Sequence, residues 1–87
     1  MYNKKYILTK IEEFNRHNPL YDDVEGSTCY LVYFNPGERG WFLWESDIQF
    51  DYPHRVHTSI VKDVSYGERQ VIVETQNTRF TFEEIVK

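Results

Sequence analysis

Three side chains suited to metal or acid–base chemistry stand close together just past the middle of the chain: Asp51, His54 and His57. Zinc binds carboxylate and imidazole groups, but it needs four ligands, or three and a water molecule. Cys29 or His17 would have to complete the set. The spacing fits no structural zinc pattern, and two histidines three residues apart on a strand point to opposite faces. We therefore expect no metal and no cofactor, with a small metal-dependent enzyme as an alternative.

Candidates for a catalytic nucleophile are few. Ser59 lies two residues from His57, and a hydroxyl needs such a base to attack a substrate. Cys29, the single cysteine, lies inside an apolar segment, where a buried thiol is inert. The four glycines stand singly and form no phosphate-binding motif. The sequence predicts that the protein is not an enzyme.

The acidic residues are concentrated in the middle of the chain. The net charge is −4, but residues 17–54 hold seven acidic residues and one arginine, Arg39. The same stretch holds nine of the fifteen aromatic residues, including Trp41 and Trp44. Aromatic residues dominate many protein–protein contacts, and acidic groups steer association with a basic partner. Nucleic acid requires basic residues at its phosphates, so we expect no direct binding of nucleic acid through this surface.

These observations predict an acidic, aromatic surface that binds a basic, nucleic-acid-binding protein. The residues expected to contact this partner are Trp44, Glu45, Asp47, Asp51 and Tyr52, with Asp22, Asp23 and Glu25 as an auxiliary acidic edge. Trp44 is the expected anchor, and the carboxylates are expected to pair with lysine or arginine. On one strand Trp41 and Trp44 point to opposite faces, so one is expected in the core and the other at the surface.

One helix and five strands are expected to position these residues. Ile7, Ile11 and Phe14 recur at helical spacing, which predicts an amphipathic helix over residues 3–17 that ends before Pro19. The expected strands span residues 27–34, 41–46, 55–64, 70–75 and 78–83. The sequence thus predicts a single α+β domain over residues 1–87. In it the N-terminal helix packs on a five-stranded antiparallel meander sheet or small open barrel.

The C-terminal segment, residues 54–84, carries a short strand-and-hairpin pattern. Its residues are His57, Thr58, Ser59, Val61, Val73, Glu74, Thr75, Asn77 and Phe80. The segment resembles the C-terminal part of small uncharacterised proteins from phages and bacterial mobile elements. This resemblance implies an inhibitor of host defence, similar to anti-CRISPR proteins, that occupies the basic groove of a nuclease. A structural or self-associating phage component is the alternative.

The location of the protein is predicted from two absences in the sequence and from its cysteine content. The N-terminal residues hold no apolar run of the length found in signal peptides, and no stretch approaches the roughly 20 apolar residues of a spanning helix. A single cysteine excludes an internal disulfide. We therefore expect a cytoplasmic protein without membrane contact, in the host cytosol if a phage encodes it.

Overall fold

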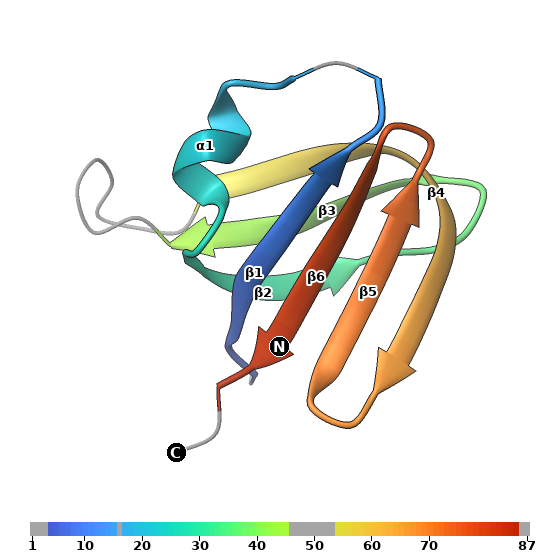
Figure 1. Ribbon diagram of the computed structural model, residues 1–87. Helices are drawn as coiled ribbons and strands as arrows, with labels where there is room; N and C mark the ends of the chain where they lie inside the picture. Colours follow the sequence, from blue (N-terminus) through green and yellow to red (C-terminus); the bar gives the residue numbers. More distant parts are fainter. Residues whose placement is uncertain (1–3, 16, 46–53, 86–87) are drawn as a thin grey trace.

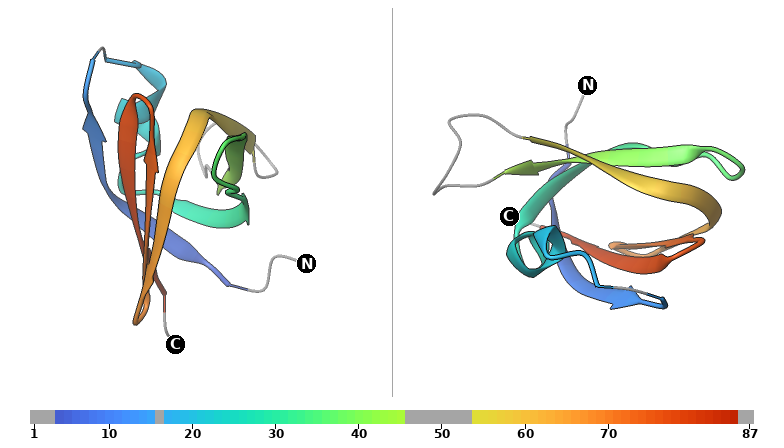
Figure 2. Two further views of the ribbon diagram at one scale, coloured as in Figure 1. Left: turned by 90° about the vertical axis from the view of Figure 1, so that its right-hand side faces the viewer. Right: turned by 90° about the horizontal axis from the view of Figure 1, so that it is seen from above.

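The computed structural model describes residues 4–15, 17–45 and 54–85. They form a closed, antiparallel six-stranded barrel with one short helix (Figure 1). The strands are β1 (Tyr6–Glu13), β2 (Thr28–Tyr33), β3 (Arg39–Glu45), β4 (His54–Gly67), β5 (Gln70–Thr75) and β6 (Thr78–Glu84), and the helix is α1 (Leu20–Val24). Each strand pairs with the next in sequence, and β6 pairs with β1 to close the ring, which Figure 2 shows from above.

The predicted α+β fold is wrong, because the expected N-terminal helix over residues 3–17 is instead strand β1. A bulge after Leu8 adds one residue to β1, so Leu8 and Ile11 face the same side although they lie three residues apart. Their partners on β6 are Phe82 and Phe80. The bulge therefore produces the three-residue spacing that also marks a helix. Pairing along the whole of β1 covers the edge that a five-stranded sheet would leave open.

Helix α1 begins at Leu20, just after Pro19, whereas the sequence predicts a helix that ends before Pro19. Pro19 occupies the position before α1, and the Asn18 side chain accepts a hydrogen bond from the Leu20 amide at 3.1 Å. Tyr21 and Val24 are buried, so α1 packs one face against the end of the barrel. Among the described residues no helix is long and apolar enough to cross a bilayer.

The barrel interior is filled by aromatic and aliphatic side chains. The Phe42 ring makes edge-to-face contacts with Phe80 and Phe82, with centroids 5.7 and 5.3 Å apart. Trp44, only 5% exposed, belongs to the same core as Phe42. Because the barrel is closed, one set of alternate residues on every strand is covered, and the other set forms the outer surface.

Strand β4 is long enough to serve two neighbours. Its first half pairs with β3 as far as Ile60, and its second half pairs with β5 from Val61 onward. Backbone hydrogen bonds at this change tie β4 to both adjoining turns: the Val61 amide donates to Glu38 O at 2.8 Å, and the Gln76 amide donates to Ile60 O at 3.0 Å. The change of partner brings Thr58 and its neighbours to the mouth of the barrel.

Candidate functional site

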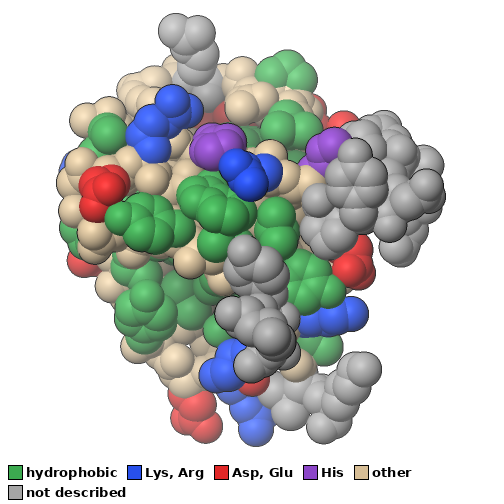
Figure 3. Space-filling model, turned by 180° about the vertical axis from the view of Figure 1, so that it is seen from behind, with side chains coloured by type: hydrophobic (Ala, Val, Ile, Leu, Met, Phe, Trp, Pro, Cys, Tyr) green, Lys and Arg blue, Asp and Glu red, His purple; other side chains and the backbone are tan. Residues whose placement is uncertain are grey.

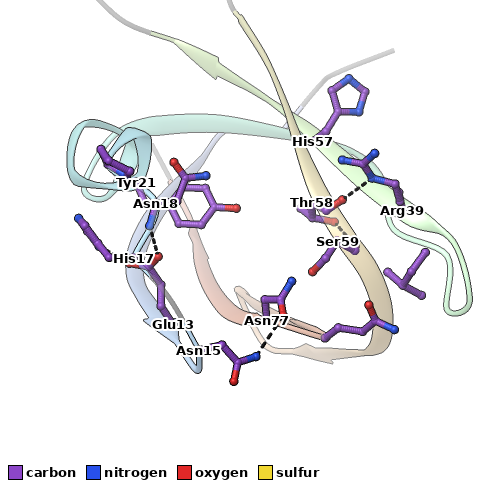
Figure 4. A pocket seen from close by; sticks show the side chains of 13 residues that line it. Glu13, Asn15, His17, Asn18, Tyr21, Arg39, His57, Thr58, Ser59 and Asn77 are labelled. Carbon is purple, nitrogen blue, oxygen red and sulfur yellow. Dashed lines mark hydrogen bonds and ion pairs between the residues drawn. The ribbon is translucent and has the colours of Figure 1, made fainter.

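A polar cleft of about 810 Å³ opens at one end of the barrel. Its walls come from the end of β1 and the following loop, from α1, from β3 and β4, and from the β5–β6 turn. Figure 4 shows Arg39, Thr58 and Ser59 on one side of the cleft and His17, Asn18 and Tyr21 on the other. The volume lies within the roughly 300–1,000 Å³ typical of ligand pockets.

His17 bridges two carboxylates on the α1 side of the cleft. Its Nδ1 lies 2.8 Å from Oε1 of Glu13, and its Nε2 lies 2.9 Å from Oδ2 of Asp22. Ionised carboxylates only accept hydrogen bonds, so the two contacts favour the protonated imidazole, in which both ring nitrogens donate. The hydrogen bonds to Asp22 and Glu13 accordingly raise the pKa of His17 above its ordinary value. The bridge ties α1 to β1.

The second oxygen of Glu13 is also engaged. Its Oε2 accepts a hydrogen bond from the Asn18 amide at 2.6 Å. Both oxygens of this carboxylate therefore contact donors, and its negative charge lies beside the positive charge of His17. Glu13 and Asp22 together carry two negative charges, and His17 offsets at most one of them, so the α1 wall of the cleft keeps a net negative charge.

The opposite wall carries a tethered arginine. Arg39 Nε donates to the carbonyl oxygen of Thr58 at 3.0 Å, while its side chain remains exposed. The Gly40 amide donates to Thr58 Oγ1 at 3.0 Å and ties the start of β3 to β4. Ser59 Oγ donates to Thr75 Oγ1 at 2.9 Å, which links β4 to β5. Strand β4, which binds the Arg39 guanidinium, is thus linked by side-chain hydrogen bonds to β3 on one side and to β5 on the other.

The outer face of β2, β3 and β4 is rich in aromatic and basic side chains. We call the set Tyr30, Trp41, Leu43, Arg55 and His57 the aromatic–basic face. In the register of the sheet, Leu43 stands between Tyr30 on β2 and Arg55 on β4, and Trp41 stands opposite His57. Figure 3 views the molecule from this side and shows hydrophobic side chains gathered around basic and histidine side chains.

Trp41 is the centre of this face. The Arg55 guanidinium carbon lies 4.6 Å from the indole centroid, which is the geometry of a cation–π contact. The His57 ring lies 6.4 Å away on the neighbouring strand. Lys5 Nζ stands 5.9 Å from the Tyr30 ring on β2. Because His57 also lines the cleft, the aromatic–basic face and the cleft form one continuous surface.

The expected anchor Trp44 lies in the core, and Trp41 is the tryptophan that faces outward. Glu45, at the end of β3, accepts a hydrogen bond from the Tyr30 hydroxyl at 2.9 Å and therefore lies at the edge of the aromatic–basic face. The other expected residues of this group, Asp47, Asp51 and Tyr52, lie outside the described residues.

The expected acidic edge lies on and beside α1. Asp22 is bound by His17, and Glu25 Oε2 accepts a hydrogen bond from the Ile11 amide at 2.7 Å. Asp23 is exposed. These three carboxylates belong to the α1 side of the mouth and not to the aromatic–basic face, whereas Glu45 lies at the edge of that face.

The two histidines of the metal alternative lie on opposite faces of β4. His54 stands opposite Trp44, which points inward, and His57 stands opposite Trp41, which points outward. Directly opposed residues of an antiparallel pair share a face, so one ion cannot bind both histidines on this strand. Asp51 lies outside the described residues. Burial raises the pKa of the Cys29 thiol to about 12, so this cysteine is neutral near neutral pH.

Sequence reasoning missed Arg39 and the aromatic–basic face, although a signal was present. In "RGWFLWE" (39–45) the residues Arg39, Trp41 and Leu43 alternate with Gly40, Phe42 and Trp44. Arg55 and His57 have the same alternation on the next strand. The cleft itself combines segments far apart in sequence, and no local pattern marks it.

No protein-family model matches the chain, and no curated protein or solved structure shows significant similarity to it. The resemblance of residues 54–84 to phage proteins therefore stays a prediction.

Proposed function

We propose that the protein is a non-catalytic binding module that recognises another protein through the aromatic–basic face. The observation that carries this proposal is the Trp41 indole on the outside of the barrel, with the Arg55 guanidinium 4.6 Å from its centroid. Tryptophan, tyrosine and arginine supply most of the binding energy at many interfaces. A stacked arginine is already ordered and loses less conformational entropy when a partner binds.

The charge of the chain favours a protein partner over nucleic acid. The net charge is −4 and the isoelectric point is about 5.3. Single-stranded nucleic acid also stacks on aromatic side chains, but its affinity depends on a groove of basic residues along the backbone. The bases beside the aromatic–basic face are accompanied by Glu45, which contacts Tyr30.

The state of the candidate nucleophiles supports a non-catalytic role. Cys29 is buried and neutral, and the Ser59 hydroxyl donates its hydrogen bond to Thr75 rather than to a histidine. A nucleophile needs an adjacent base or a lowered pKa. The Cys29 thiol has a raised pKa, and the contact of the Ser59 hydroxyl is with Thr75, which is not a base.

The biological role within this proposal follows from the resemblance of residues 54–84. It is a phage-encoded inhibitor that acts in the host cytosol. The expected pairing with a basic partner concerns the acidic residues of α1 and of residues 45–52. This expected pairing is a separate prediction, and the contacts of Trp41 do not support it.

The test compares the half-buried Trp41 of the aromatic–basic face with an exposed aromatic residue outside it. A photo-crosslinking amino acid at position 43, beside Trp41 on the aromatic–basic face, or at position 66 is used to capture the partner from host lysate, and the affinity of the purified partner is then measured. Tyr66 is 76% exposed near the end of β4, so Tyr66→Ala is the matched control. Trp41→Ala is expected to weaken binding at least about thirtyfold, and Tyr66→Ala less than about twofold. Equal affinities of the two variants would overturn the proposed function.

A further inference from the structure

We propose that the partner inserts an acidic side chain into the cleft, between Arg39 and His57, and lays adjacent apolar residues on Trp41. The class of partner segment is therefore an acidic, apolar peptide. This inference rests on the proposed function, since it assumes that the aromatic–basic face binds a protein. It adds to that function the kind of side chains that the partner segment must carry.

The positions of Arg39 and Trp41 suit an extended segment. Gly40 between them is buried, while Arg39 is exposed and Trp41 faces outward. Alternate residues on a strand lie roughly 7 Å apart, and alternate residues of an extended peptide have the same spacing. His57 lines the cleft and stands opposite Trp41. A segment seated on Trp41 can therefore place a nearby side chain beside Arg39.

The guanidinium of Arg39 is prepared to bind a carboxylate. Its Nε is held by the Thr58 carbonyl oxygen, and no hydrogen bond among the described residues engages its terminal nitrogens, so both can bind as a fork. Arginine binds carboxylates through two parallel hydrogen bonds in this way. Within residues 4–15, 17–45 and 54–85, no carboxylate forms an ion pair with Arg39. The positive charge in the cleft is thus not neutralised by the described part of the chain.

The carboxylate that lines the cleft does not compete for this position. Glu13 uses one oxygen for His17 and the other for the Asn18 amide. His17 offsets its charge. An entering anion therefore meets a positive charge at Arg39 and, across the cleft, the negative charge that His17 leaves uncompensated among Glu13 and Asp22, so it is expected to bind on the Arg39 side. The volume of about 810 Å³ admits such a side chain together with its neighbours.

The experiment selects peptides on the full chain. A display library of random twelve-residue peptides is selected on the wild-type protein and counter-selected on Trp41→Ala. We expect the recovered peptides to carry aspartate or glutamate next to aromatic or aliphatic residues. The affinity of the best synthetic peptide is then measured for Arg39→Gln, Arg39→Lys and Lys62→Gln. Lys62 is an exposed base on β4 outside the cleft, which makes Lys62→Gln the charge-matched control.

Arg39→Gln is expected to weaken peptide binding at least about tenfold, because it removes the charge and the fork. Arg39→Lys keeps the positive charge but not the fork, so its affinity for the peptide is expected to lie between those of Arg39→Gln and wild type. Lys62→Gln should change affinity less than twofold. Circular dichroism of Arg39→Gln and Arg39→Lys shows whether each variant is folded, and Arg39→Lys keeps the test valid if Arg39→Gln unfolds.

The failures of the two proposals are distinguishable. Peptides that require Trp41 but lack acidic residues and bind Arg39→Gln normally would overturn this inference and leave the proposed function intact. The recovery of no peptide that prefers wild type to Trp41→Ala would overturn both. Displacement of the peptide by an equal concentration of a single-stranded oligonucleotide would assign the surface to nucleic acid and overturn both as well.

Discussion

The two halves of the barrel exterior use arginine in different ways. On β1, β5 and β6, Arg79 lies 2.9 Å from Glu74 on one neighbouring strand and 3.6 Å from Glu12 on the other. Arg79 also lies 5.9 Å from the Phe14 ring centroid. On β2, β3 and β4, Arg55 lies 4.6 Å from the Trp41 ring centroid, and none of the ion pairs among the described residues involves it. Figure 1 shows the first set of strands in front and β2 and β3 behind. On β1, β5 and β6, basic side chains pair with acidic side chains of neighbouring strands. On β2, β3 and β4, aromatic and basic groups are left to contact a partner.

The difference has a simple energetic meaning. Ion pairs between neighbouring strands place opposite charges side by side, and the hydrogen bond from Arg79 to Glu74 raises the pKa of the arginine further. A partner gains little by replacing such pairs, because it must first separate them. An arginine stacked on an indole keeps its donors free for an incoming group. The aromatic–basic face is therefore the half suited to binding.

The largest expected effect is a change in the core that both halves share. Phe42→Ala removes a fully buried ring that contacts Phe80 and Phe82, so the free energy of unfolding should fall by about 3–5 kcal/mol. Urea unfolding followed by tryptophan fluorescence measures the change. A loss below about 1 kcal/mol would mean that the barrel is not a single packed unit.

The next effect separates the two halves directly. Arg55→Ala is expected to lower partner affinity about threefold to tenfold, because it removes the stacked cation beside Trp41. Arg79→Ala, on the charge-paired half, is the matched control and should leave affinity within about twofold. Calorimetric titration with the partner or the selected peptide measures both. A larger loss for Arg79→Ala than for Arg55→Ala would reverse the comparison.

The smallest effect concerns the bridge that closes the α1 side of the mouth. The pKa of His17 is raised in the folded protein from the ordinary value of 6.5, so charged His17 stabilises the fold. This contribution is complete below about pH 6.5 and is lost as the pH rises through the higher pKa of the folded state. We expect His17→Gln to be destabilised relative to wild type at pH 5.5, and this difference to shrink above that pKa.

Thermal unfolding across a pH series measures this difference between His17→Gln and wild type. Asp22→Asn removes one of the two carboxylates and should lower the pKa of His17 in an NMR titration. A difference between His17→Gln and wild type that grows as the pH rises would contradict the assigned bridge.

The strands after residue 27 were predictable because their alternation is local. Each of the five expected ranges overlaps one of β2 to β6. The N-terminal strand was not predictable from the spacing of Ile7, Ile11 and Phe14, because that spacing fits one face of a helix, whereas the bulge after Leu8 places Ile7 and Ile11 on opposite faces of β1. Helix α1 was missed because Pro19 was interpreted as the end of a helix, whereas proline is equally suited to the first positions of one.

The site was predictable only in part. The alternation of β3 showed that Trp41 and Trp44 face opposite sides, but it did not show which side the closed barrel covers. That choice depends on pairing with β2 and β4, which are distant in sequence from each other. Counting charge along residues 17–54 likewise treated Asp22 and Glu45 as one surface, although the fold places them on α1 and at the end of β3.

The most direct test of the account is an NMR map of the peptide-bound protein. Amide chemical shifts are compared before and after addition of the selected peptide. We expect the large changes to gather on β3 and the first half of β4, from Arg39 to Leu43 and from Arg55 to Ser59, while the amides around Arg79 stay unchanged. Large changes on β1, β5 and β6, with none near Trp41, would contradict it.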